Sequence, residues 1–415
     1  MADDEIKPFT ISIPEDSLTD LRSRLSNARY PSELEDAGNE MGAPLQAIQR
    51  IATHWATKYD WRKAEAELNS LPHFTTTLQA GGFEPLEIHF IHARSPREDA
   101  IPLMFVHGWP GSFLEARKLL KPLTEPDDDK LPAFHVVVPS LVGYGFSQGA
   151  KKKGFGADQN AEVFHRLMLR LGYEEYATQG GDWGFMITRA MGRMYAPKYV
   201  KAQHLNFDWY PKPSLKRNPL TLLRTVVSSM ITGFSEREQK GLDRTKWFRE
   251  NGSGYIQVQS TKPQTLGYAL ADSPVALLAW IYEKLVDWTD EYPWTDDEVC
   301  TWVSIYWFST AGPRAAHQLY YEVMHSGSGN AESAALEAAT AWQDVKVGLG
   351  HFPRDLVVLP RGWGHVLGNI VFEKDHERGG HFAAWEVPEL LVGDLREMFG
   401  EKGGAHNAVK TGSPS

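Results

Sequence analysis

The sequence predicts an α/β fold with a mainly parallel central sheet, a helical insertion over that sheet and an N-terminal segment wrapped around it. Two patterns indicate this fold. From about residue 86, short apolar or β-branched runs alternate with helical stretches, which is typical of a parallel sheet covered by helices on both faces. Near residue 208 the alternation stops, and the periodicity is helical or irregular to about residue 325.

Five strands are expected before the insertion, in the first part of the core (86–207). They are short runs of apolar, β-branched or aromatic residues bounded by Pro or Gly. Helical stretches such as SFLEARKLLKPL and AEVFHRLMLRLG lie between them. The expected strands are 86–93, 101–109, 134–141, 176–183 and 199–207.

The insertion is expected to form a mainly helical lid over 208–330. Seven of the fourteen tryptophans lie in it, between Trp209 and Trp307, and they predict an apolar, aromatic-lined cavity. A helix over 332–343 returns the chain to the second part of the core, 331–402. In that part, short strands are expected near 345–349 and 368–374.

The two ends of the chain are expected to lie outside this core. Residues 1–85 contain helical patterns but no closed core of their own, so we expect them to wrap around the main domain. The last residues, 403–415, are small and polar, and we expect a flexible tail there.

Composition excludes several classes of function. The formal net charge is −10, from 43 Lys and Arg against 53 Asp and Glu, and no basic cluster indicates nucleic acid binding. The single cysteine, Cys300, cannot form an internal disulfide and fits a reducing compartment. Neither a signal peptide nor an apolar run of membrane-spanning length is visible. We therefore expect a soluble, cytoplasmic protein without a membrane anchor.

The pentapeptide GGDWG (180–184) has Asp182 where the nucleophile elbow of an α/β-hydrolase has its serine. A strand that runs into a sharp glycine-flanked turn and then a helix places the turn residue above the carboxyl edge of the sheet, where open α/β sheets bind ligands. The alternative is that Asp182 caps the following helix, because Asp is a favoured N-cap residue. The pentapeptide alone does not decide between the two interpretations.

Two further motifs favour the nucleophile. HGWPGS (107–112) directly follows an apolar strand, where an α/β-hydrolase supplies one oxyanion-hole amide. The second amide comes from the residue after the nucleophile, so the expected donors are the backbone N–H groups of Trp109 and Trp183. The hydrolase order of nucleophile, acid and histidine is completed by Asp355 and by His381, which lies in a glycine-flanked loop 26 residues later.

At these motifs the chain resembles epoxide hydrolases of the α/β-hydrolase fold, specifically the microsomal-type branch with its soluble fungal members. The resemblance covers most of the chain. It implies that Asp182 is the nucleophile, His381 the base and Asp355 the orienting acid. Membrane-bound relatives carry an N-terminal anchor that this sequence does not show. The most specific stretches are HGWPGS, GGDWG, GYIQVQSTKPQT, ADSPVALLAWI and RGGHFAAWEVPELL.

The resemblance also implies two lid tyrosines that hydrogen-bond the epoxide oxygen and supply its proton. These are Tyr255, which opens YIQVQSTKP, and Tyr320 in AAHQLYYE. The neighbouring Tyr321 leaves a one-residue alternative for the second position. Tyr320 is preferred because of its distance from Glu322.

A carboxylate nucleophile suits an epoxide, because an epoxide offers alkyl carbons for in-line displacement, whereas a serine suits acyl transfer. We expect an epoxide and water to give a vicinal diol through an ester on Asp182, with no metal and no organic cofactor. A haloalkane dehalogenase on the same fold is the nearest alternative, and a non-catalytic ligand-binding receptor is a more distant one. The particular epoxide, the preferred enantiomer and the oligomeric state, a homodimer included, stay open.

Overall fold

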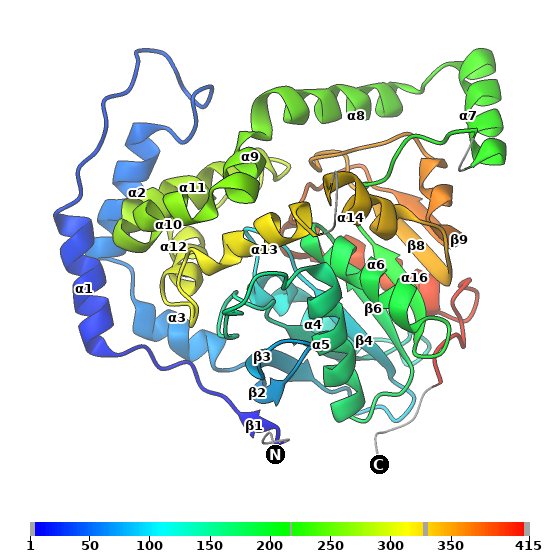
Figure 1. The fold of residues 1–415 in the computed structure, drawn as a ribbon, viewed down its shortest axis with the longest axis horizontal. Coiled ribbons are helices and arrows are strands. Elements are labelled where there is room, and N and C mark those ends of the chain that lie inside the picture. The colour runs from blue at the N-terminus through cyan, green and yellow to red at the C-terminus, as the bar shows by residue number, and fades with distance from the viewer. Residues whose placement is uncertain (1–4, 216–217, 327–330, 411–415) are drawn as a thin grey trace.

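The structure is a computed structural model that describes residues 5–215, 218–326 and 331–410. Within these residues a nine-stranded sheet crosses the molecule in the order β1-β2-β3-β5-β4-β6-β7-β8-β9 (Figure 1). The strands are β1 Lys7–Pro8, β2 His73–Leu78, β3 Leu86–Ala93, β4 Ile101–Val106, β5 Phe134–Pro139, β6 Tyr176–Gly180, β7 Val200–Leu205, β8 Gln343–His351 and β9 Gly368–Asp375.

Most of this sheet is parallel. Six neighbouring strands run parallel to one another, in the order β5, β4, β6, β7, β8 and β9. The antiparallel strands β3, β2 and β1 extend the sheet beyond β5. Every residue of β4 and of β5 is buried, as expected for strands covered on both faces. The predicted α/β fold and its mainly parallel sheet are confirmed. The five strands expected before the insertion are β3 to β7, and the two expected after it are β8 and β9.

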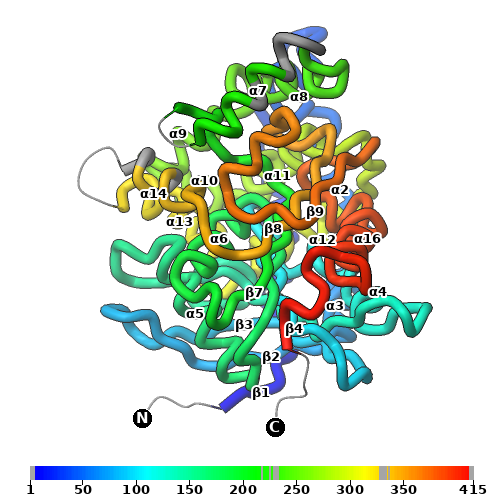
Figure 2. Tube along the Cα trace, turned by 90° about the vertical axis from the view of Figure 1, so that its right-hand side faces the viewer, coloured from blue at the N-terminus to red at the C-terminus, as the bar shows by residue number. Residues whose placement is uncertain are grey.

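Helices cover the two faces of the sheet. Helices α5 (Ala157–Arg170) and α6 (Trp183–Tyr195) pack against each other, and α6 contacts β4 and β6. Helices α4 (Arg117–Thr124) and α16 (Pro388–Phe399) also pack together, and they contact β5 and β8. Figure 2 shows the strands between these two pairs. The α5–α6 pair and the α4–α16 pair therefore form the outer layers of the core.

The segment between β7 and β8 is mainly helical in its described residues, as expected for a helical lid over 208–330. The helix expected over 332–343 is α14 (Ala331–Thr340), which ends earlier because Gln343 already starts β8. The expected lid boundary at residue 330 lies outside the described residues. The lid helices, which lie above the sheet in Figure 1, are α7 Pro219–Thr232, α8 Glu236–Trp247, α9 Gly254–Thr261, α10 Pro263–Asp272, α11 Pro274–Asp287, α12 Asp296–Trp307 and α13 Ala315–Met324.

The N-terminal segment lies against the lid. It contains α1 (Glu15–Ser26), α2 (Leu45–Thr57) and α3 (Trp61–Leu68), and α2 packs on α11 and α12. The sequence does not predict β1 and β2, although both belong to the sheet. The run FTTT in β2 has no apolar alternation, and its threonines at 75 and 76 are nevertheless buried. The division at residue 85, which separates β2 from its partner β3, stays a prediction.

The start of the expected flexible tail is packed. Ala405 and Val409 are buried, and the Ala405 amide donates a hydrogen bond of 3.0 Å to the Met398 carbonyl oxygen. Lys346 Nζ donates to the Gly404 carbonyl oxygen at 2.8 Å. Two small apolar side chains thus hold residues 403–410 on the core. Residues 411–415 lie outside the described residues.

Candidate active site

Asp182 occupies the turn between β6 and α6. Its φ of 48° and ψ of −125° lie in a region that residues with a side chain rarely adopt. In the part of the chain that the structure describes, the Asp182 side chain makes no capping hydrogen bond to α6, which does not support the N-cap interpretation. A Cβ at Gly184 would lie 1.9 Å from the Val106 carbonyl oxygen. Glycine there lets α6 begin directly beside β4, and this contact fixes the turn that presents Asp182.

The loop after β4 contacts the Asp182 carboxylate. The Trp109 backbone N–H donates to Asp182 Oδ1 at 2.8 Å. A Cβ on Gly108 would lie 2.3 Å from the same oxygen, so the loop can approach this closely only with glycine. Trp183, the second expected donor, is the first residue of α6. Amides of a first helical turn have no partner within the helix and lie at its positive end, which suits a developing oxyanion.

His381 and Asp355 complete the cluster. His381 lies in the loop between β9 and α15 (Ala383–Glu386), and Asp355 follows β8. His381 Nδ1 lies 2.7 Å from Asp355 Oδ1, and Nε2 lies 3.5 Å from Asp182 Oδ2. The structure therefore brings together the three side chains that were expected from chain order.

The charges of this cluster stabilise a proton on His381. Burial opposes the imidazolium, but the carboxylates of Asp355 and Asp182 outweigh burial and raise the pKa of His381 to about 10. Both Asp355 and His381 are buried, so water screens their interaction little. The two carboxylates therefore favour the protonated form of His381.

The two tyrosines implied by the family resemblance lie side by side above this cluster. Tyr255 is on α9 and Tyr320 on α13, and their ring centroids are 5.9 Å apart. The Tyr255 ring stacks on Trp109 at 5.1 Å, and the Tyr320 ring meets Trp183 edge-on at 4.6 Å. Burial, with the charge of Asp182 added to it, raises the pKa of both phenols well above their ordinary value. Both side chains are therefore neutral donors.

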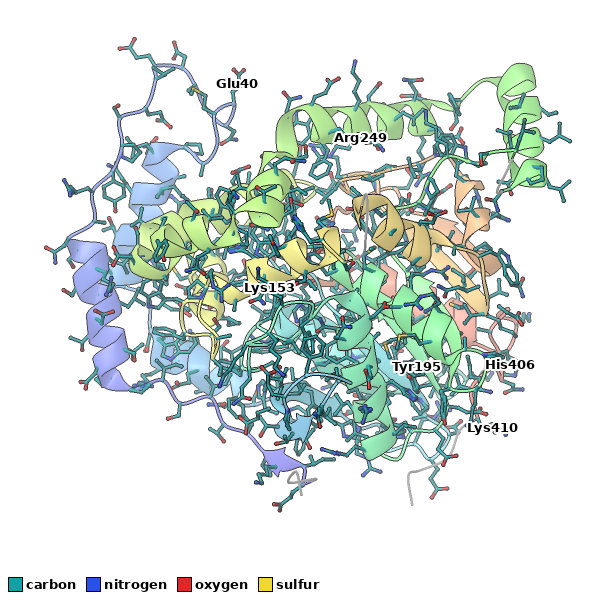
Figure 3. The ribbon with its side chains drawn as sticks, in the orientation of Figure 1. Glu40, Lys153, Tyr195, Arg249, His406 and Lys410 are labelled. Atoms are coloured by element: carbon teal, nitrogen blue, oxygen red, sulfur yellow. The ribbon has the colours of Figure 1, made fainter. Side chains whose placement is uncertain are left out.

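A cavity of about 260 Å³ lies between the lid and Asp182. Asp182, Tyr255 and Tyr320 all border it. Arg249, labelled in Figure 3, comes from the turn after α8. The cavity thus presents one carboxylate and two phenols to a mostly apolar molecule. Its other lining residues are Trp183, Met186, Phe207, Trp209, Phe248, Ser253, Ile256, Gln257, Val323, Met324 and Leu356.

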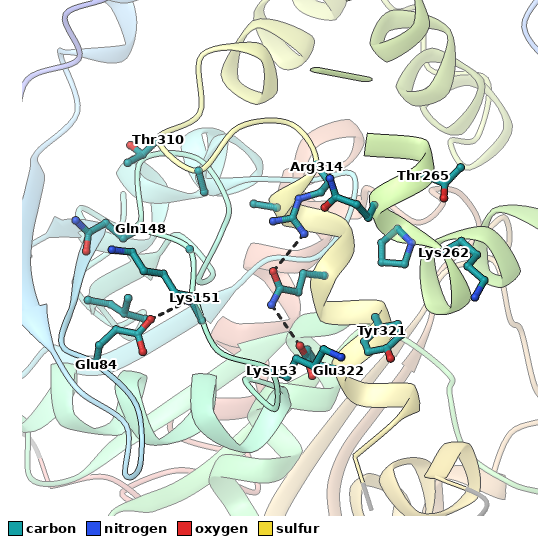
Figure 4. Close-up of a pocket in the computed structure, with 18 of the residues that line it drawn as sticks. Glu84, Gln148, Lys151, Lys153, Lys262, Thr265, Thr310, Arg314, Tyr321 and Glu322 are labelled. Carbon is teal, nitrogen blue, oxygen red and sulfur yellow. Dashed lines mark hydrogen bonds between the residues drawn. The ribbon is translucent and has the colours of Figure 1, made fainter. Parts of the chain in front are cut away.

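Tyr321, the alternative to Tyr320, points elsewhere. It lines a larger hollow of about 830 Å³ on the outer face of α13, shown in Figure 4. Its ring stacks on His325 with centroids 4.1 Å apart. The larger hollow is bordered by neither Asp182 nor Tyr255, so the smaller cavity is the one next to the expected chemistry. The structure places Tyr320, rather than Tyr321, beside Asp182.

Comparison with known proteins identifies the family. A family model of the epoxide hydrolase N terminus matches residues 6–116, and one of the alpha/beta hydrolase fold matches 101–206. A Stigmatella aurantiaca protein is 39% identical over 95% of this chain and 84% of its own length. Epoxide hydrolase 1 of Sus scrofa is 35% identical over 96% of this chain and 89% of its own. The chain belongs to the epoxide hydrolase family.

A solved structure agrees with this assignment of an epoxide hydrolase. The Aspergillus niger epoxide hydrolase matches with a TM-score of 0.80 at 36% identity, covering 95% of this chain and 96% of that chain. Both the α/β-hydrolase fold and the hydrolase class expected from the motifs are confirmed. Among the helices that the structure describes, none has the length and apolar character needed to cross a membrane.

Sequence patterns missed two residues that hold the site of this epoxide hydrolase. The Trp288 carbonyl accepts a hydrogen bond of 2.8 Å from the His381 amide, and its ring meets the His381 ring edge-on at 5.1 Å. Lys284 is buried, with its ammonium 5.1 Å from the Tyr255 ring centroid. The only sequence signal is their position in the aromatic lid. A lysine is ordinarily exposed, and a tryptophan carbonyl carries no signature.

The tryptophans of the lid have two roles, one at the cavity and one in packing against the core. Of the seven between Trp209 and Trp307, Trp209 borders the cavity. Trp294 and Trp302 instead pack edge-on at 5.4 Å, and each also contacts Trp385 of the core. Trp294 and Trp302 therefore help to hold the lid on the core, while the cavity itself is lined by aromatic side chains, as expected: Trp183, Phe207, Trp209, Phe248, Tyr255 and Tyr320.

Proposed function

We propose that this epoxide hydrolase converts an epoxide and water to a vicinal diol through a covalent ester on Asp182. The position of the Asp182 carboxylate supports this mechanism most strongly. It borders the cavity that contains both phenols, it accepts the Trp109 amide, and it lies 3.5 Å from the His381 imidazole. The nucleophile, the proton donors for ring opening and the base for ester hydrolysis are then adjacent.

In the first step, an Asp182 carboxylate oxygen attacks one epoxide carbon and forms a C–O bond. The bond between that carbon and the ring oxygen breaks, and the ring oxygen keeps the electron pair. Tyr255 or Tyr320 then gives this oxygen a proton. The raised pKa values of the two phenols do not prevent the transfer, because an alkoxide is a still stronger base.

Ester formation changes the protonation of His381. The ester removes the negative charge of Asp182, which is one of the charges that raise the pKa of this histidine. The pKa of His381 therefore falls, and the proton that it releases restores the neutral tyrosine. The imidazole becomes a base only after the substrate is bound covalently.

In the second step, His381 takes a proton from water while the water oxygen attacks Cγ of the Asp182 ester. The Trp109 and Trp183 amides stabilise the oxyanion of the tetrahedral intermediate. The bond between Cγ and the ester oxygen breaks, and His381 returns its proton to the departing alkoxide. The products are the diol and the Asp182 carboxyl group, which ionises to restore the imidazolium. Asp355 holds the imidazole in the required orientation throughout.

One observation also fits a second reaction of the same nucleophile, the displacement of a halide. The indole Nε1 atoms of Trp109 and Trp183 are buried and have no hydrogen-bond partner among the described residues. Such donors would suit a departing halide, as in a haloalkane dehalogenase. The paired phenols favour the epoxide, because ring opening needs a proton and halide release does not. Parallel assays of diol formation and halide release separate the two reactions.

Isotope labelling tests the proposed ester directly. In a single turnover in ¹⁸O-labelled water, the label should enter Asp182 and the first diol should be unlabelled, because water attacks the ester carbonyl and not the epoxide. Mass spectrometry of the diol and of the peptide that contains Asp182 measures both. A labelled first diol would show that water attacks the epoxide itself and that Asp182 is at most a general base.

A further inference from the structure

A second, much smaller space borders Asp182, which, of the residues that the structure describes, is the one that it shares with the lining of the cavity. It has a volume of about 10 Å³ and is bordered by Asp182, His381, Glu115, Asn206 and residues 105–109, among others. We call it the rear chamber. A space of this size holds about one water molecule. Among the described residues, His381 borders the rear chamber and not the cavity, so the base faces this space.

Glu115 borders the rear chamber but has no role in the two reaction steps proposed above. It lies in the short 3₁₀ turn Phe113–Ala116 after the HGWPGS loop, and its side chain is buried. A Cβ on Gly111 would lie 1.5 Å from Glu115 Oε1. The Glu115 carboxyl group therefore packs directly against Gly111, at a position where a residue with a side chain would clash with it. The loop that carries the Trp109 amide therefore also fixes Glu115 behind Asp182.

The environment of Glu115 couples it to the same pair of residues. Burial raises the pKa of Glu115 to about 8, while the charge of His381 lowers it and that of Asp182 raises it. Hydrogen bonds with the backbone of Gly108 and Ser112 also lower its pKa, and the rear chamber leaves room for a further hydrogen bond with a water molecule. The carboxyl oxygen can accept such a bond whether or not the group holds a proton.

Asn206 borders the rear chamber from the sheet side. Its Oδ1 accepts a hydrogen bond of 2.6 Å from Gln179 Nε2, which orients the amide and leaves Nδ2 as the group that donates. A buried water molecule typically makes about three hydrogen bonds. Once ester formation has deprotonated His381, its Nε2 and the Glu115 carboxyl group can accept and Asn206 Nδ2 can donate, so the three groups match the two hydrogens and one lone pair of water. The second lone pair is free to attack Asp182 Cγ.

We propose that the rear chamber is the binding site of the water molecule that hydrolyses the ester, and that Glu115 holds this water by accepting its second hydrogen. The inference rests on the proposed ester mechanism. Water then reaches Cγ from the rear chamber and not through the cavity that holds the substrate. Glu115 should affect hydrolysis of the ester and not its formation.

The test measures the two steps separately in Glu115→Met and Glu115→Gln, by rapid quench and intact-protein mass spectrometry. Glu115→Met removes the acceptor, and we expect it to slow ester hydrolysis about tenfold or more while alkylation stays within about twofold, so that the ester accumulates. Glu115→Gln keeps an acceptor oxygen in the same shape, and we expect its hydrolysis rate to stay closer to that of the parent enzyme.

Glu65 provides a matched control. It is also a buried glutamate, but it accepts hydrogen bonds from the Ile13 amide and the Trp61 indole in the N-terminal segment. Glu65→Met should lower thermal stability without changing the ratio of the two rates. The inference is overturned if Glu115→Met hydrolyses the ester at the parent rate, or if alkylation slows as much as hydrolysis. If the parent enzyme forms no ester at all, the proposed mechanism fails instead.

Discussion

At the scale of single residues, the carboxylate of Asp182 is held from several sides. The Trp109 amide contacts Oδ1, the His381 imidazole lies near Oδ2, and the backbone has the unusual φ of 48°. These restraints leave the carboxylate little rotational freedom, which lowers the entropic cost of aligning it with an epoxide carbon. In the proposed mechanism, Tyr255 and Tyr320 then protonate the oxygen that leaves this carbon.

The tyrosine pair allows a prediction at this scale. Two donors to one developing alkoxide share a task, so their effects should be non-additive. Each of Tyr255→Phe and Tyr320→Phe should slow alkylation about 10-fold to 100-fold, less than the loss of a sole oxyanion donor, and the double variant should be nearly inactive. Rapid-quench kinetics should show no burst of ester in the double variant.

Tyr321→Phe is the control for this pair, because Tyr321 lines the outer hollow. It should keep nearly full activity. If Tyr321→Phe is the impaired variant, the assignment along α13 is wrong by one residue. If all three single variants are nearly as active as the parent enzyme, the proton comes from another group and the tyrosines lose their proposed role.

Much of the site was predictable from the sequence at this scale. Asp182, Trp109, Asp355 and His381 stand at positions that strand ends and chain order define, so local patterns suffice to find them. The tyrosines were found only by resemblance, because a lid tyrosine has no local signature. Glu115 could not be found at all, because its role depends on the position of the HGWPGS loop against β6.

At the scale of elements, His351 at the end of β8 joins three parts of the chain. Its Nδ1 lies 2.8 Å from Asp208, which follows β7, and its Nε2 lies 3.3 Å from Glu373 on β9. Burial opposes its charge, but these two carboxylates raise the pKa of His351 to about 10. The ion cluster ties the start of the lid to the strands that precede Asp355 and His381.

Stability should depend on pH through this element. The pKa of His351 is raised above its unfolded value, so its contribution is complete below about pH 6.5 and is lost as the pH rises toward about 10. The midpoint of thermal unfolding should therefore fall more steeply between about pH 6.5 and about 10 in the parent enzyme than in His351→Gln. If the midpoint falls equally steeply with pH in both proteins, this histidine does not couple protonation to folding.

The elements themselves were predicted unevenly. Strands β4 and β5 are continuous apolar runs, so sequence alone finds them. Strand β2 was missed because its threonines give no alternating pattern, and its burial depends on pairing with β3. The sequence correctly predicts that the tryptophan-rich segment is helical. It does not predict whether Trp302 lines the cavity or packs on the core, because that depends on how the segment folds back over the sheet.

At the scale of the whole molecule, distant segments meet around the active site. The Trp302 indole on α12 donates to the Pro110 carbonyl oxygen at 2.5 Å, and the Tyr306 hydroxyl donates to that of Gly111 at 2.5 Å. The Trp55 indole on α2 donates to Ser304 of the same lid helix at 3.1 Å. The N-terminal segment, the lid and the HGWPGS loop are thus joined through α12. Sequence patterns predict each segment but not these contacts, because they involve residues far apart along the chain.

The central claim is that Asp182 forms a covalent ester with the substrate and that hydrolysis of this ester requires His381. His381→Gln removes the base but leaves the nucleophile, so it should react once with an epoxide and then stop. Asp182→Asn is the control and should show no early adduct. Intact-protein mass spectrometry after incubation with a reactive epoxide such as a styrene oxide measures both variants. The account predicts that His381→Gln gains the mass of one substrate molecule, located on the peptide that contains Asp182. An unmodified His381→Gln protein that demonstrably binds the epoxide would contradict it.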